Sequence, residues 1–251
     1  MRMVVLAVVL LGLIGAKIPV ERSVDRAQRE LHLRSVDLSL SLREQIGQLG
    51  FVAALSGFRA IVADVVFIEA HVAWERTDWA RVIWFFRQAT TLQPHMILFW
   101  DMAAWHMAWN ASVAALNDTS QPRQTLRVKA QREYIALGKD FLERGIRNNP
   151  SRPELYEALG HLYRDKLNDH LHASESFAKA AALPDAKAYD KRFAAYELSY
   201  CEGHERDAYE QLRGLYDSGE NERLPTLLKR LKALEEKLNI PAAQRISDNV
   251  P

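Results

Sequence analysis

Histidine is the residue type in this 251-residue chain best suited to bind a metal, and eight histidines are present. A zinc site of the His-Glu-x-x-His type needs two histidines four residues apart on one helix face. His170 and His172 are two residues apart, so a helix would point them to different sides. The other histidines show no four-residue spacing with a carboxylate nearby. The sequence therefore predicts no metal site, and it predicts no cofactor.

A second arrangement that could do chemistry is the row Asp101, His106 and Asn110. His106 and Asn110 are four residues apart and share a helix face, whereas the five-residue step from Asp101 faces less well. The sequence contains no Gly-x-Ser-x-Gly, P-loop or Gly-x-Gly-x-x-Gly motif, and Cys201 has no basic partner of known geometry. We therefore expect a non-catalytic protein. An enzyme, or an enzyme subunit, that uses this row or the N-terminal region is the alternative.

All six tryptophans lie between positions 74 and 109. Trp79, Trp84 and Trp100 occupy positions that a pair of helices would bury, so we expect them in the core. Trp105 and Trp109 are four residues apart and share a helix face directed away from the expected packing positions. These two have less reason to be buried, and the sequence leaves open whether they bind a partner or form core.

The composition favours an all-α protein with a sizeable core. Hydrophobic residues make up 48% of the chain, and the 11 glycines and 9 prolines form few hairpin turns. The net charge of +1 removes the electrostatic argument for nucleic-acid binding. A single cysteine excludes an internal disulfide framework.

The N-terminus has the pattern of a membrane-targeting segment. Residues 3–16 are uncharged and lie between Arg2 and Lys17. As a helix they would span about 21 Å, short of the roughly 30 Å hydrocarbon core of a bilayer. Residues 1–20 are therefore predicted to be either a cleaved signal peptide or an uncleaved anchor. The side of the membrane on which the remainder lies stays open.

The sequence after this segment divides into a linker, a helical domain and a tail. Residues 21–41 are predicted to form a charged linker or an amphipathic helix, and residues 241–251 are predicted to form a flexible tail. Between them, residues 42–240 predict a helical domain. Its first part, residues 42–70, indicates two packed helices with a glycine break near Gly57.

From Ala63 onward, small and aromatic residues recur at helical spacing. Val82, Phe86 and Ala89 follow each other by four and three residues and precede Pro94. A second run has Tyr156, Leu159, Gly160 and Tyr163, followed by Ala173, Phe177, Ala180 and Pro184. Both runs resemble the tetratricopeptide repeat, a pair of helices with the pattern W-x₂-L-G-x₂-Y and then A-x₃-F before a proline.

The resemblance implies a solenoid of helix pairs. The pairs are expected at about residues 63–94, 97–150 with an insertion, 153–184 and 188–217, followed by a capping helix at 224–238. In the second pair the second helix is expected from Tyr134, after an inserted segment. At Gly160 two helices would touch, so leucine there would be destabilising and alanine would be tolerated.

In this repeat family the first helices of successive pairs line a groove that binds peptide segments. Carried over to this sequence, the resemblance implies that the groove is lined by Phe67, His71, Trp74, Asp101, Trp105, Trp109, Glu157, His161 and Arg164. These residues would form an aromatic floor with a polar wall, suited to an apolar or extended segment. The alternative is that residues 42–70 or 117–133 fold over this face and use the tryptophans as core.

The sequence thus predicts a non-catalytic scaffold of the bacterial envelope, tethered to the membrane or exported across it. Its partner would be a protein or a peptide segment of an envelope complex, with no nucleic acid involved. Besides the enzyme alternative, the chain could be a purely structural subunit of a membrane complex, with its aromatic face permanently buried.

Overall fold

The computed structural model describes residues 57–246, and all regular structure in that range is helical. The all-α prediction is confirmed for this part of the chain. The predicted signal peptide or anchor, the linker and residues 42–56 of the helical domain lie outside the described residues. Between residues 57 and 246, no helix is both long enough and apolar enough to cross a bilayer.

The chain divides into two units, residues 1–88 and 89–251, and each is described by itself. The α-helices are α3 (Arg59–Glu75), α4 (Trp79–Leu92), α5 (Ile97–Trp105), α6 (Ser112–Leu116), α7 (Gln124–Asn148), α8 (Pro153–Leu162), α9 (His170–Ala181), α10 (Ala188–Leu198), α11 (Glu205–Ser218) and α12 (Pro225–Lys237). Two π-helices, η1 (His106–Ala111) and η2 (Tyr163–Leu167), extend α5 and α8. Two short 3₁₀ helices are η3 (Glu220–Glu222) and η4 (Ala242–Gln244).

In the first unit, α3 packs against α4 through small residues and aromatic rings. Ala63 and Ala70 of α3 are fully buried. The Phe67 and His71 rings meet the Phe86 ring of α4 edge-on, with centroids 5.9 and 6.1 Å away. The small side chains let the helices approach, and the rings fill the remaining space.

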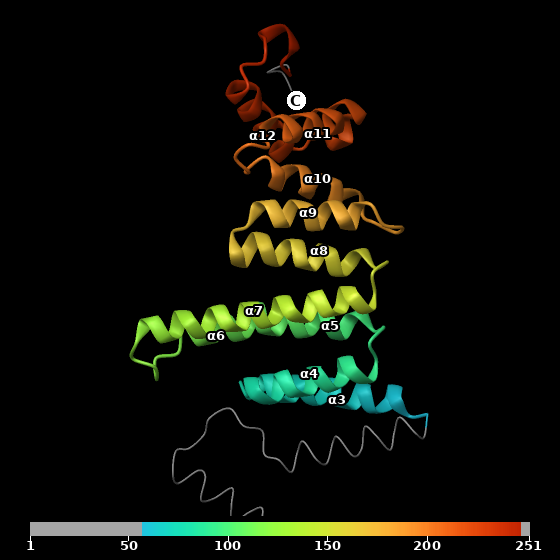
Figure 1. The fold of residues 1–251 in the computed structure, drawn as a ribbon, viewed down its shortest axis with the longest axis vertical. Coiled ribbons are helices and arrows are strands. Elements are labelled where there is room, and N and C mark those ends of the chain that lie inside the picture. The colour runs from blue at the N-terminus through green and yellow to red at the C-terminus, as the bar shows by residue number, and fades with distance from the viewer. Residues whose placement is uncertain (1–56, 247–251) are drawn as a thin grey trace, which may run out of the picture. The chain divides into compact units, whose positions relative to one another are not determined.

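In the second unit, each long helix packs against the next one along the chain, so that successive layers stack (Figure 1). The order of contacts is α5 with α7, α7 with α8, α8 with α9, α9 with α10, α10 with α11 and α11 with α12. Contacts between α5 and α8 also bring two first helices of the predicted pairs together. The antiparallel neighbours and short links are those of helix hairpins.

Local sequence signals set where several of these helices begin. Proline occupies the first helical position of α8 and α12, where its missing N–H costs nothing. The Asp169 carboxylate accepts a hydrogen bond from the backbone N–H of His172 and so caps α9. Gly203 turns the chain between α10 and α11 with φ of +84°, a conformation that favours glycine.

The segment expected to be an insertion instead lengthens both helices of the second pair. The first helix continues through η1 and α6 to Leu116, and α7 begins at Gln124 rather than at Tyr134. The added turns of α6 and α7 pack against each other. Val128 and Ala130 in the extension of α7 are half-buried, so the extra residues gain apolar contacts that an inserted loop would not have.

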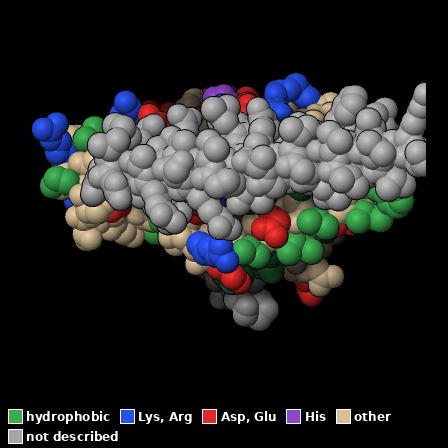
Figure 2. Space-filling model, turned by 90° about the horizontal axis from the view of Figure 1, so that it is seen from below, with side chains coloured by type: hydrophobic (Ala, Val, Ile, Leu, Met, Phe, Trp, Pro, Cys, Tyr) green, Lys and Arg blue, Asp and Glu red, His purple; other side chains and the backbone are tan. Residues whose placement is uncertain are grey.

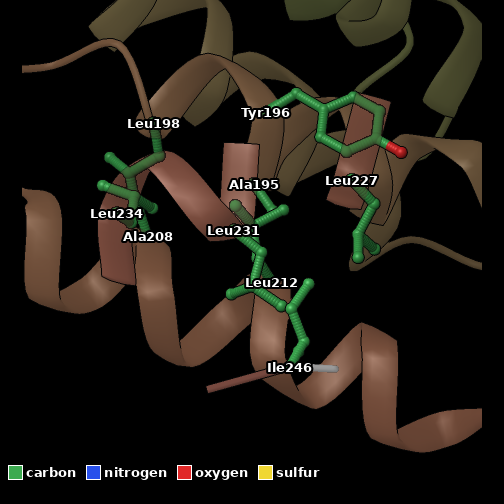
Figure 3. Close-up of a cluster of buried hydrophobic side chains, with 9 residues drawn as sticks. All are labelled: Ala195, Tyr196, Leu198, Ala208, Leu212, Leu227, Leu231, Leu234 and Ile246. Carbon is green, nitrogen blue, oxygen red and sulfur yellow. The ribbon is translucent and has the colours of Figure 1, made fainter. Parts of the chain in front are cut away.

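The C-terminal end of the second unit has its own core (Figure 3). Leu212 of α11 and Leu227 and Leu231 of α12 are fully buried there, and Ile246 packs in the same cluster with 6% of its surface exposed. The backbone N–H of Ile246 donates to the Glu235 carboxylate at 2.9 Å. Ile246 therefore packs in this core, whereas residues 241–245 are exposed, and the flexibility expected for residues 241–251 stays a prediction.

An exposed ion pair joins the start of α11 to the end of α12. The Lys237 ammonium donates to Glu205 at 2.6 Å, and together with backbone N–H groups at the helix start it lowers the Glu205 pKa to about 2. Because the folded pKa is depressed below 4.5, this stabilisation is present above pH 4.5 and is lost as the pH falls through about 2. We expect Lys237→Ala to raise the Glu205 pKa toward 4.5 in a carboxyl NMR titration. An unchanged pKa would contradict the pairing.

Candidate functional site

The candidate site is the face that the first helices of the predicted pairs present in the second unit. We call it the first-helix face. Its side chains are Asp101, Trp105, Trp109, Glu157, His161, Arg164, Lys166, Lys187, Tyr189 and Phe193. These residues come from α5 with η1, from α8 with η2, and from α10 with the residue that precedes it.

The aromatic part of the first-helix face is formed by two tryptophans. The Trp105 side chain, at the end of α5, is 42% exposed. Trp109 lies in η1 and is half-buried, with the Lys166 ammonium 5.3 Å from its ring centre. Lys166 belongs to η2, so a cation–π contact links the two π-helices. Single-turn π segments within α-helices occur frequently at functional sites.

The polar part of the face is organised around Glu157 of α8. Its carboxylate accepts hydrogen bonds from the Lys187 ammonium at 2.9 Å and from the Tyr189 hydroxyl at 2.6 Å. Both donors come from the start of α10, and so these bonds tie α8 to α10. The resulting pKa of Lys187 is raised by its bonds to Tyr189 and Glu157. Lys187 therefore remains positively charged at neutral pH.

Asp101 of α5 brings a second carboxylate to this region. Solvent reaches the Asp101 side chain, but the protein atoms packed around its carboxylate displace part of its water and so raise its pKa. The negative charge of Glu157 raises the Asp101 pKa further, whereas the charge of Lys187 lowers it. The two carboxylates and one ammonium therefore interact across α5, α8 and α10, on a surface that solvent still reaches.

His161 and Arg164, which were expected to line the polar side of the groove, are half-buried against neighbouring side chains. The His161 ring meets Phe177 and Phe193 edge-on, at 5.1 and 5.7 Å between centroids. Burial lowers the His161 pKa, which favours the neutral ring. Arg164 forms two hydrogen bonds with the Asp165 carboxylate and lies 5.7 Å from the Phe193 ring centre. These two side chains support the face as much as they line it.

The three other predicted groove residues belong to the first unit. The Phe67 and His71 rings are 4.6 Å apart, and the His71 ring nitrogen Nδ1 is 3.0 Å from the Phe67 carbonyl oxygen. Trp74, in the last turn of α3, is half-buried. That these residues share a groove with Trp105 stays a prediction.

Two of the three tryptophans expected in the core are buried, and the third is not. Trp84 and Trp100 are buried, with 7% and 2% of their surface exposed. Trp79 is only half-buried, because it is the first residue of α4 and lies at the helix end rather than in its interior. The expectation of a core position therefore holds for Trp84 and Trp100 but not for Trp79.

The row considered for catalysis is split between two environments. The Asn110 amide is 3.1 Å from Nδ1 of His106, as the four-residue spacing predicts. The His106 side chain is completely buried, whereas Asp101 is exposed. A substrate that touched Asp101 would not reach His106 without a rearrangement of η1. Between residues 57 and 246, no group of three or more His, Cys, Asp or Glu side chains could hold a metal ion.

Sequence reasoning missed the contribution of α10 and its flank to this face. Lys187, Tyr189 and Phe193 contact Glu157, His161 and Arg164, although the predicted groove ended with the third pair. The signal was available, since Tyr189 and Phe193 are four residues apart in the expected first helix of the fourth pair. Lys166 was missed because η2 changes the helical spacing after Tyr163.

The second unit also has an open, mainly apolar hollow of about 600 Å³ along α7. It is lined by Gln124, Thr125, Val128, Lys129, Arg132, Glu133 and Ala136. These residues form one side of a single helix and mix both signs of charge. We therefore do not assign the hollow to the candidate site.

The charge coupling across the first-helix face can be measured directly. Glu157→Gln removes the carboxylate charge that raises the Asp101 pKa, so we expect this pKa to fall in a carboxyl NMR titration. It should stay above 3.8, because burial is the larger cause. Glu154→Gln is the matched control, since Glu154 pairs with Arg152 at 2.8 Å instead. Equal titration of Asp101 in both variants would mean that α5 and α8 do not bring the carboxylates together.

No family model matches this sequence, and no match is found among curated proteins. The resemblance to the tetratricopeptide repeat is therefore carried only by the residue pattern of the two runs that end at Pro94 and Pro184.

Proposed function

We propose that the first-helix face binds an apolar or extended segment of a partner protein, and that the chain acts as a non-catalytic scaffold. The observation that carries this proposal is the exposure of Trp105. In the same short helix Phe99 and Trp100 are each 2% exposed, whereas Leu98 and Trp105 are 48% and 42% exposed, and Trp105 is the larger of the two exposed side chains. Tryptophan is enriched among the residues that anchor protein interfaces.

The surroundings of Trp105 suit recognition of a peptide segment. Trp109 extends the aromatic surface, and Asp101 on the same helix adds a charged group within one turn. Glu157 and Lys187 add a fixed ion pair on the neighbouring helices. An apolar anchor beside oriented polar groups is the usual composition of a binding surface.

The proposal includes a solenoid of tetratricopeptide-like helix pairs in the bacterial envelope. The support for the repeat is the order of helix contacts in the second unit, with first and second helices alternating along the chain. The support for the envelope is the uncharged run of residues 3–16, which would act as a signal peptide or an anchor. The partner would then be a protein of an envelope complex.

A purely structural role in a membrane complex is the second candidate, because a permanent interface would also need an aromatic face. An enzyme that uses the Asp101 and His106 row has less support, since His106 is buried. The scaffold role and the structural role differ in how long the partner stays bound. A permanent interface would leave the purified chain aggregated or always in complex, whereas a scaffold would release its partner.

The test is recovery of partners from solubilised membranes with a tagged full chain, quantified by mass spectrometry. We expect Trp105→Ala to reduce the recovery of at least one protein several-fold. Leu126→Ala removes an exposed apolar side chain from α7, the second helix of the same pair, where Leu126 is 41% exposed, and should leave recovery unchanged. Equal recovery with both variants would refute the proposal.

A further inference from the structure

Helix α3 of the first unit is apolar on two sides, and only one of them is buried in the part of the chain that the structure describes. Ala63, Val66, Ala70 and Ala73 form the buried side. The second side carries Phe58, Ile61, Val65 and Ile68, which are 58%, 59%, 53% and 60% exposed. We call these four residues the α3 stripe.

The spacing of the α3 stripe makes it one continuous surface. Its residues follow each other by three, four and three positions, which places them on one face of a helix. The packed side of α3 uses other positions, so the stripe is not an extension of the α3–α4 contact. Figure 2 shows several hydrophobic side chains next to one another on the surface that it views. Single apolar residues scattered over a surface are normal, whereas a contiguous exposed apolar surface is typical of an interaction site.

The charges that border the α3 stripe are acidic. At 100° per residue, Asp64 and Glu75 lie along one edge and Glu69 lies along the other, and all three are exposed. Arg59 is on a different side of the helix, and Arg76 comes only after its last turn. The surface is therefore an apolar strip between negative edges.

We propose that the α3 stripe binds an amphipathic helix of a partner protein whose own apolar stripe is bordered by lysine or arginine. An apolar face laid against an apolar face excludes water from both, which is a common mode of helix recognition. The acidic edges select for a basic partner and against an acidic one, because like charges at the rim oppose association. The same edges disfavour an anionic lipid surface as the occupant.

The test uses three designed helical peptides of equal length and the full chain held in zwitterionic nanodiscs. One peptide has a leucine stripe bordered by lysine, the second has glutamate in place of lysine, and the third has the leucines at scrambled spacing. We expect the lysine peptide to bind at least tenfold more tightly than the other two. Equal binding of the lysine and glutamate peptides would overturn the proposal.

Matched variants locate the binding. Val65→Asp should weaken the lysine peptide at least tenfold, and Val113→Asp, at another exposed helical valine, should leave it unchanged. Asp64→Lys combined with Glu69→Lys should reverse the preference toward the glutamate peptide. Glu175→Lys combined with Glu210→Lys makes the same change at exposed positions in the second unit and should not reverse it. Loss of binding in both members of a matched pair would overturn the assignment.

Accessibility shows whether something else already occupies the stripe. In a Cys201→Ser background, Val65→Cys should react rapidly with a maleimide, and the lysine peptide should protect it. Slow reaction before peptide is added would mean that a segment of the chain itself, the bilayer or a second copy covers the stripe, and would overturn the proposal. Trp105→Ala should leave peptide binding here unchanged, so this inference and the proposed function fail separately.

Discussion

Replacing Gly138 with leucine is expected to destabilise the second unit more than any exposed substitution. A Cβ atom at Gly138 of α7 would lie 2.8 Å from the Ala108 Cβ and 2.9 Å from the Ala104 carbonyl oxygen. The carbonyl is backbone of α5, so relief requires the two helices to separate. Overpacking of this kind costs about 1–3 kcal/mol and occasionally more. Alanine should also destabilise the protein, because the clash already involves Cβ.

Gly214 provides the matched control for this prediction. It lies inside α11, and a Cβ there would meet no atom within 4 Å. Gly214→Ala should therefore stabilise the protein by up to about 1 kcal/mol, the difference in helix propensity. Thermal melting followed by circular dichroism measures both effects. A Gly138→Leu variant that melts with the parent would show that α5 and α7 do not approach as described.

Trp100→Ala and Trp105→Ala should have opposite consequences, although the two residues are in the same helix. Trp100 is 2% exposed, and its indole Nε1 donates to the Pro94 carbonyl at 2.9 Å. Its truncation should cost about 3–5 kcal/mol of unfolding free energy. That corresponds to a fall of roughly 10 °C in the melting temperature for a unit of this size.

Truncation of Trp105 should cost under about 1 kcal/mol, because its side chain is already 42% exposed. Its effect should appear in partner recovery instead. Thermal melting of the two variants beside the parent separates these outcomes. Equal losses of stability would mean that Trp105 is core, and the first-helix face would then lose its aromatic anchor.

Much of the fold was predictable from the sequence because its signals are local. Pro153 and the run from Leu159 to Tyr163 indicate α8, and the leucines after Pro225 indicate α12. The extension of α6 and α7 was not predictable in the same way. Residues 112–116 and 124–133 lack the small and aromatic pattern of the repeat, and their contact with each other stabilises them as helices.

For alanine at Gly160, the structure points to a less favourable outcome than the sequence predicts. Helix propensity alone predicts a mild or favourable substitution. A Cβ at Gly160 would instead lie 2.9 Å from two ring atoms of Phe177, whose side chain is fully buried. The sequence indicates that a small residue is needed at this position. Whether one additional carbon atom fits there depends on the distance between the two helices, and tertiary packing sets that distance.

For the candidate site, the sequence located the helices but not their mutual contacts. The four-residue spacing of Trp105 and Trp109 predicted a shared face, and the exposure of Trp105 agrees with it. The bonds from Lys187 and Tyr189 to Glu157 join residues 30 and 32 positions apart, and no local pattern encodes such pairs. The burial of His161 between Phe177 and Phe193 has the same origin.

The central claim, that the first-helix face receives a partner segment, is tested most directly by site-specific photo-crosslinking. A benzophenone amino acid replaces Trp105 in one full chain and Leu126 of α7 in another, and cross-linked peptides are mapped in cells that produce the native protein. We predict that position 105 cross-links to one continuous segment of another protein, and that position 126 does not. Cross-links from position 105 only to residues of its own chain, or equal yields at both positions, would contradict the account.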